Sequence, residues 1–206
     1  TVIGTYLFAM GLGSWASRHV RENLAGMFVR VELIVGVVGG LMPAALFAAH
    51  ATLPAASMIS FKVLLYGLVT IVGIGVGLEI PIVMRLLDRH LKGRDSLSTL
   101  VSQVLTFDYL GSLVVSVAFP LLLVPHLGIV RSGVFFGLLN TLVAIWSMWL
   151  FRAEIPRWRW LGAQCGAIFA LLVSAIQLMR STIAPLPRWK CATRSSARPR
   201  SSVEVR

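Results

Sequence analysis

Three acidic residues interrupt apolar stretches of this chain, and they are the side chains with the clearest capacity for chemistry: Glu32, Glu79 and Asp108. A carboxylate within a membrane is costly unless it has a partner, a water-lined cavity or a function. Each lies within about two helical turns, roughly 10 Å, of loops that we expect on one side of the membrane. The three could therefore meet at one depth and form a cation, polyamine or proton site.

A structural role is the alternative interpretation of these acids. Long side chains near a helix end can reach the membrane surface, and buried acids commonly pair with a base. The neighbouring arginines available for such pairs are Arg18, Arg30 and Arg85. No spacing rule shows that the acids converge, so both interpretations stay open.

Other motifs predict no chemistry. Residues 73–79 read GIGVGLE, which imitates a nucleotide-binding loop, but that motif needs a strand before it and an amphipathic helix after it. Here an apolar run precedes it and Pro81 follows, so we interpret the glycines as helix-packing positions. His126, beside Pro125, is expected at a membrane interface, and the prolines are expected to interrupt helices. We predict no catalytic, cofactor-binding or metal-binding residue, since no HExxH, GxSxG, CxxC or Walker sequence occurs.

The composition is that of a membrane protein. Of the 206 residues 57% are hydrophobic and 13% charged, against about 25% charged in soluble domains. The net charge of +11 would suggest nucleic acid as a partner in a soluble protein. Here the basic residues fall in loops and at the end, so we expect a lipid bilayer as the partner and no nucleic acid.

Six apolar segments follow one another, and helix is the state that satisfies their backbone groups in lipid. They predict an all-α fold: a polytopic transmembrane bundle of about six helices over residues 1–180. A bilayer core needs about 20 apolar residues, so the first segment is short for a span. The segments are Val2–Trp15, Val31–Ala49, Val63–Met84, Leu105–Leu127, Val130–Phe151 and Trp160–Met179.

The basic residues are distributed unevenly among the loops. The loops after the first, third and fifth segments carry ten Lys and Arg, and the two loops between carry only Lys62 and Arg131. This asymmetry places the odd-numbered loops in the cytoplasm. It predicts a multi-pass protein of the bacterial inner membrane, with an aromatic cluster at one interface: Trp146, Trp149, Trp158 and Trp160.

The two ends of the chain depart from this pattern. Residues 181–206 are rich in Arg, Ser and Pro without apolar periodicity, so we expect a disordered basic tail. Such a composition also fits a GC-rich gene read out of frame. The chain starts without Met inside an apolar run, which we interpret as a truncated N-terminus.

Several stretches of the sequence resemble the membrane domain of integral-membrane spermidine-synthase-like proteins, the polyamine aminopropyltransferases. The resemblance covers most of residues 1–180, and the joint occurrence of the GxEIP and FDYLG elements makes it fairly specific. The matching stretches are residues 77–85 (GLEIPIVMR), 101–113 (VSQVLTFDYLGSL), 119–128 (FPLLLVPHLG) and 11–15 (GLGSW).

The resemblance implies a helical domain that precedes an aminopropyltransferase domain of Rossmann-like fold. In that family the second domain binds decarboxylated S-adenosylmethionine and a diamine, and it transfers an aminopropyl group. Its Gly-rich loop and acidic catalytic residues have no counterpart here, because the chain leaves the family pattern near Ile183. We therefore expect a membrane domain without its catalytic domain and carry over no catalytic residue.

Three functions stay open at this point. The first is the membrane domain of a spermidine-synthase-like protein that binds or passes a diamine or polyamine. The second is a small transporter or half-transporter for a cation or polyamine, which buried acids and interrupted helices would suit, although no internal repeat supports it. The third is a structural membrane anchor. The sequence decides neither among them nor the oligomeric state.

Overall fold

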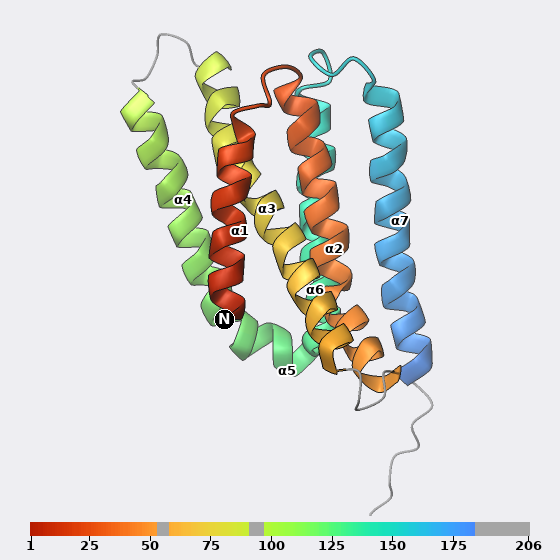
Figure 1. Ribbon diagram of the computed structural model, residues 1–206. Helices are drawn as coiled ribbons and strands as arrows, with labels where there is room; N and C mark the ends of the chain where they lie inside the picture. The colour runs from red at the N-terminus through yellow and green to blue at the C-terminus, as the bar shows by residue number, and fades with distance from the viewer. Residues whose placement is uncertain (53–57, 91–96, 184–206) are drawn as a thin grey trace, which may run out of the picture.

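The computed structural model describes residues 1–52, 58–90 and 97–183, and this part of the chain is helical without any strand (Figure 1). The predicted all-α fold is thus confirmed for the described residues. The elements are α1 (Val2–Ser17), α2 (Leu24–Thr52), α3 (Met58–His90), α4 (Leu97–Ala118), a π-helical turn η2 (Phe119–Leu123), α5 (Val124–Leu127), α6 (Ile129–Leu150) and α7 (Trp158–Ile183).

Five helical runs are long and apolar enough to cross a membrane: α2, α3, the continuous run Ser98–Leu127, α6 and Trp158–Met179 of α7. The chain is thus consistent with a multi-pass membrane protein. The helix α1 has 16 residues, which is shorter than the roughly 20 that a bilayer core needs. The prediction that the first segment is short for a span agrees with this length.

The helices extend past the apolar segments that predicted them. Arg30 lies inside α2, and Arg85 and Arg89 lie inside α3, although the sequence pattern had assigned all three to loops. The helix α3 has 33 residues, about 50 Å of helix against a hydrocarbon core of about 30 Å. The helix continues into its polar ends because the backbone N–H and C=O groups there stay hydrogen-bonded. The charged side chains at these ends can still reach water.

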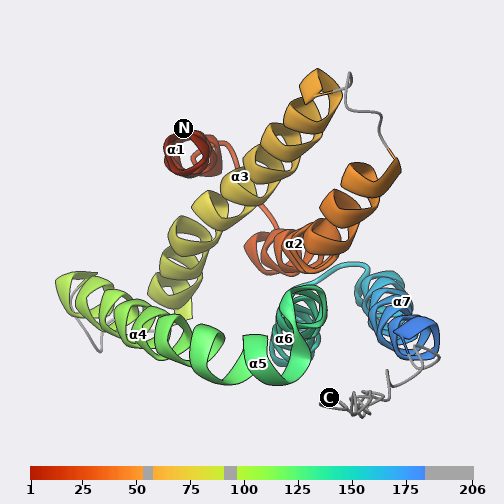
Figure 2. The same ribbon diagram turned by 90° about the horizontal axis from the view of Figure 1, so that it is seen from below.

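The long helix α3 lies between α1 and α2 and packs against both (Figure 2). Its glycines explain this position. A Cβ at Gly73 or Gly77 would collide with Ala9 or the Met10 backbone of α1, whereas one at Gly75 would collide with Val35 of α2. The GIGVG run is therefore a packing motif, as predicted, because its glycines let α3 approach two helices closely.

A second close approach joins α2 to α6. Gly36 and Gly40 form a GxxxG pair on α2, and Gly133 and Gly137 form another on α6. A Cβ at Gly137 would lie 2.5 Å from the carbonyl oxygen of Gly36, and one at Gly40 would lie 3.1 Å from the Cα of Gly137. Small residues four apart on both helices thus bring the two backbones together. The helix α7 packs mainly against α6 and also contacts α2.

In contrast, α4 lies at the edge of the bundle, beside α3 (Figures 1 and 2). Leu100 is buried, but Phe107 is 75% exposed and Tyr109 is 69% exposed. At the end of α4 the chain passes through η2, where Pro120 stands, and turns across the lower end of the bundle. The predicted interruption at Pro120 is therefore present, because a proline lacks the N–H that regular α-helix requires. By comparison, Pro81 lies inside the continuous helix α3.

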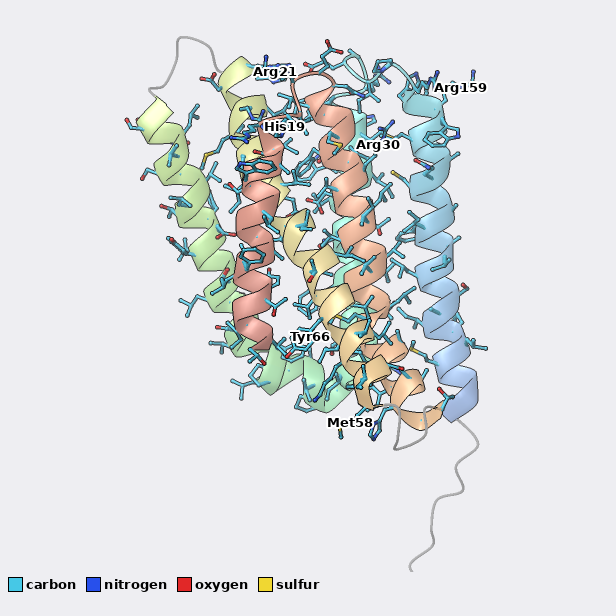
Figure 3. All side chains as sticks on the ribbon, in the orientation of Figure 1. His19, Arg21, Arg30, Met58, Tyr66 and Arg159 are labelled. Atoms are coloured by element: carbon cyan, nitrogen blue, oxygen red, sulfur yellow. The ribbon has the colours of Figure 1, made fainter. Side chains whose placement is uncertain are left out.

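One end of the bundle carries most of the described basic residues, and we call it the basic end. The α1–α2 and α6–α7 connections and the C-terminal end of α3 lie there (Figure 1). Figure 3 shows Arg21, Arg30 and Arg159 at this end, with Met58 and Tyr66 at the opposite end. The basic connections thus share one side, as their charge pattern predicts. The helix α7 ends at Ile183, beyond the expected boundary at residue 180, and the remainder of the predicted tail, 184–206, lies outside the described residues.

Candidate functional site

The candidate site centres on Glu79 of α3. The side chain is partly buried, and its Oε1 is buried without a hydrogen-bond partner among the described residues. Two positions on, Pro81 supplies no N–H to the carbonyl of Gly77, so the regular helical hydrogen bond is missing beside Glu79. A buried acceptor without a donor costs about 1–3 kcal/mol, and more when it is charged. The position thus favours a positively charged or donating ligand.

A second acid approaches Glu79 from α2. Glu32 is 7% exposed, and its carboxyl lies close enough to that of Glu79 for the two to interact electrostatically. In the described part of the chain neither carboxyl belongs to an ion pair. Two neighbouring acids without a base repel each other when both are charged, so a cation between them would be stabilised.

The third acid approaches from the other side. Asp108 is exposed on α4, and both Asp108 and Glu79 interact electrostatically with the phenol of Tyr6 on α1. The phenol of Tyr6 is thus within electrostatic range of both acids. The structure brings α1, α2, α3 and α4 together around Glu79, with one polar side chain from each of the other three helices.

The three acids all lie nearer the basic end of their helices. Counted from the helix end at the basic end, Glu32 lies about 12 Å along α2, and Glu79 and Asp108 lie about 16 Å along α3 and α4, at 1.5 Å per residue. They are thus farther from the helix ends than the roughly 10 Å expected from the sequence, and we call the three together the acidic layer.

Two of the three arginines that could have neutralised these acids, Arg85 and Arg18, have other partners. The guanidinium of Arg85 donates to the carbonyl oxygens of Ser17 at 2.6 Å, Val20 at 2.8 Å and Pro81 at 3.2 Å. Arg18 lies 4.2 Å from the ring centroid of Trp15. Within the described residues the ion pair that occurs is His90–Glu154, at 2.7 Å, near the basic end. The expected pairing of the acids with Arg18, Arg30 or Arg85 is thus not found there.

Sequence reasoning had missed Tyr6 and the role of Arg85. Nothing in the local sequence around Tyr6 distinguishes it. Its position near Glu79 and Asp108 depends on how α1, α3 and α4 are arranged in space. A signal did exist for Arg85, since a base that follows an apolar run can donate to the free carbonyls at the end of a neighbouring helix.

The side chains of this layer are hydrogen-bond acceptors of the kind that suits a cation. Carboxylates and a phenol supply oxygen acceptors, and no His, Cys, Asp or Glu group of metal-binding size occurs in the described residues. His126, which was expected at a membrane interface, lies 2.8 Å through its Nδ1 from the carbonyl oxygen of Leu122, one turn earlier in the chain. Cys165 is a free, buried thiol.

Comparison with known proteins supports the resemblance seen in the sequence. The chain is 53% identical over 156 residues to polyamine aminopropyltransferase 2 of Ralstonia nicotianae, a match that covers 75% of this chain. It is 40% identical over 172 residues to the polyamine aminopropyltransferase of Leptospira interrogans, covering 84% of this chain. The chain is homologous to polyamine aminopropyltransferases over most of its own length.

These polyamine aminopropyltransferases are much longer than the region that matches. The aligned part is 29% of the Ralstonia protein, 33% of the Leptospira protein and 34% of the polyamine aminopropyltransferase of Mycobacterium tuberculosis, to which this chain is 34% identical. The chain thus spans about a third of the length of these relatives. No family model and no solved structure matches it.

Proposed function

We propose that this chain is the membrane domain of a polyamine aminopropyltransferase-like protein, and that its acidic layer binds a cationic diamine or polyamine. The observation that carries the proposal is the buried, unpartnered Oε1 of Glu79, which lies among further acids and no base. The relatives are named polyamine aminopropyltransferases, and this name is our reason for proposing a polyamine as the ligand. Linear polyamines carry several ammonium groups, each of which donates to carboxylates.

The transfer reaction itself is assigned to the rest of a longer protein. An aminopropyl transfer needs a site that holds two substrates in register, and no such constellation occurs in the described residues. We propose that a separate catalytic domain binds decarboxylated S-adenosylmethionine as a substrate. The membrane domain would then hold the diamine or polyamine near that domain or pass it across the membrane.

The proposed location is the bacterial inner membrane, with the basic end in the cytoplasm. The gathering of basic residues at one end of the bundle supports this orientation. It would place the layer of Glu32, Glu79 and Asp108 in the cytoplasmic half of the membrane. Polyamines made in the cytoplasm would reach the layer from that side.

Spermidine binding to the purified chain in nanodiscs tests the proposal. Replacement of a charged hydrogen-bonding partner costs about 1.5–3 kcal/mol, so Glu79→Gln should weaken binding by about tenfold or more. Asp108→Asn and Glu32→Gln should weaken it less, since Asp108 is exposed and no oxygen of Glu32 is among the buried atoms without a hydrogen-bond partner. The matched control is Glu22→Gln, which removes an exposed acid at the basic end.

The same variants separate the alternatives. Spermidine affinity that stays unchanged in all three acid variants would overturn the polyamine site and leave a structural anchor. Transport of spermidine into proteoliposomes by the wild-type chain, abolished in Glu79→Gln, would favour the transporter function over simple binding.

A further inference from the structure

A second site lies away from the acids, in a groove between α2 and α7 at the basic end. The groove has a volume of about 430 Å³, and Arg30, Ile34, Arg157, Trp160, Gln164 and Ile168 line it. A smaller hollow of about 230 Å³ adjoins it and is lined by the same Arg30 and Arg157. Two guanidinium groups from different parts of the chain therefore share one cavity.

The charge of this groove is not neutralised within the described structure. No acidic residue lines either hollow. Arg30 and Arg157 are exposed, and neither guanidinium group has an ion pair or a hydrogen bond among the described residues. Since two guanidinium groups hold an anion through several N–H donors, the cavity is suited to a phosphate or another anionic group.

The lower part of the groove is apolar. Ile34 lies one turn along α2 from Arg30, and Gln164 and Ile168 lie one and two turns along α7 from Trp160. Trp160 is 57% exposed near the start of α7, where tryptophan marks the interface between membrane and water. Arg30 and the first turn of α7, which contains Arg159, lie near each other at the basic end (Figure 3).

The groove thus has a basic part at the membrane surface and isoleucine side chains deeper in, an arrangement that suits an amphiphilic ligand. A phosphate ester at the level of Arg30 and Arg157 would be followed, deeper in the membrane, by a hydrocarbon chain against Ile34 and Ile168. Basic pockets between transmembrane helices at the membrane surface bind anionic lipid headgroups by this arrangement. Free phosphate shares the headgroup chemistry but would leave the apolar half of the groove unused.

We propose that the α2–α7 groove is a binding site for an anionic phospholipid, whose phosphate is held by Arg30 and Arg157. The site is separate from the acidic layer, because α7 contributes no residue to that layer. It would fix α7, which packs mainly on α6, to α2 through a lipid at the basic end.

Lipid titration followed by native mass spectrometry tests the site, with dioleoyl-phosphatidylglycerol as the probe and dioleoyl-phosphatidylcholine as the neutral lipid. Each basic residue near an anionic headgroup contributes about 5-fold in affinity, so the double variant Arg30→Gln/Arg157→Gln should lose about 30-fold. The double variant Arg30→Lys/Arg157→Lys keeps the charge and should retain most of the affinity. Circular dichroism checks that each variant is folded.

The control is Arg21→Gln/Arg152→Gln, which removes the same charge from the basic end without touching the groove. Its affinity for phosphatidylglycerol should stay within about twofold of wild type. An equal loss in this control would mean that general surface charge attracts the lipid, and the site would be overturned. Displacement of the lipid by inorganic phosphate at similar concentration would assign the arginines to free phosphate and overturn the lipid as the ligand.

Discussion

Arg85 is predicted to be the main polar connection between α1 and α3, and its replacement tests how this bundle is held together. Its Nη atoms donate to the carbonyl oxygens of Ser17 and Val20, at the C-terminal end of α1, at 2.6 and 2.8 Å. Ser17 is the last residue of α1, and its carbonyl has no donor within that helix. The guanidinium also places a positive charge at the negative end of the α1 dipole.

The magnitude follows from these contacts. A hydrogen bond that involves a charged group contributes about 1.5–3 kcal/mol, and Arg85 is half-buried, which favours the lower value. Two bonds between the helices then give about 3 kcal/mol. Arg85→Met, which keeps the apolar stem, should lower the free energy of unfolding by that amount. Arg85→Lys keeps the charge but not the two-armed fork, so it should lose about half.

Unfolding of the purified chain by sodium dodecyl sulfate in mixed micelles, followed by circular dichroism, measures these changes. The control is Arg89→Met, because Arg89 makes a single exposed bond, to the carbonyl oxygen of Arg21 at 3.1 Å. It should cost less than about 1 kcal/mol. If Arg85→Met is no more destabilising than Arg89→Met, the reasoning that connects α1 to α3 through Arg85 is wrong.

Two further predictions concern packing and the ion pair at the basic end. Gly77→Val should destabilise the chain by about 1–3 kcal/mol in the same unfolding assay, because the added side chain would collide with the backbone of α1. Gly111→Val on α4, where a Cβ meets nothing within 4 Å, should change stability by less than about 0.5 kcal/mol, and equal effects would contradict the assigned packing. Glu154→Gln removes the partner of His90, but both side chains are 41–48% exposed. Its effect on the free energy of unfolding should therefore stay below about 1 kcal/mol. A larger loss would show that the His90–Glu154 pair stabilises the fold more than an exposed ion pair does.

The sequence predicted the helices better than their contacts. Six apolar segments gave six helical runs, and the basic connections gathered at one end of the bundle. Both are local properties, because the transfer of a segment from water to lipid depends on its own side chains. Helix ends were predicted less well: Arg30 and Arg85 lie inside helices, since a helix continues past the apolar core wherever its charged side chains reach water.

The candidate site could be predicted from the sequence only in part. The unusual acids, Glu32, Glu79 and Asp108, could be identified because any charge in an apolar run is conspicuous. Their position nearer the basic end of their helices followed from the segment bounds and the helical rise. Neither property shows which faces of the helices meet, so the approach of Tyr6 to Glu79 and Asp108 could not be predicted.

What the sequence by itself determined is an all-helical, membrane-type chain with three acids in its apolar segments and a basic side. The tertiary structure decided the neighbours: α3 between α1 and α2, Arg85 on the end of α1, and Arg30 beside Arg157 in one groove. The physical reason is that lipid is as apolar as the helix surfaces, so hydrophobicity selects the segments without orienting them. Orientation comes from close packing at glycines and from a few polar contacts between helices, and these exist only when the helices are assembled.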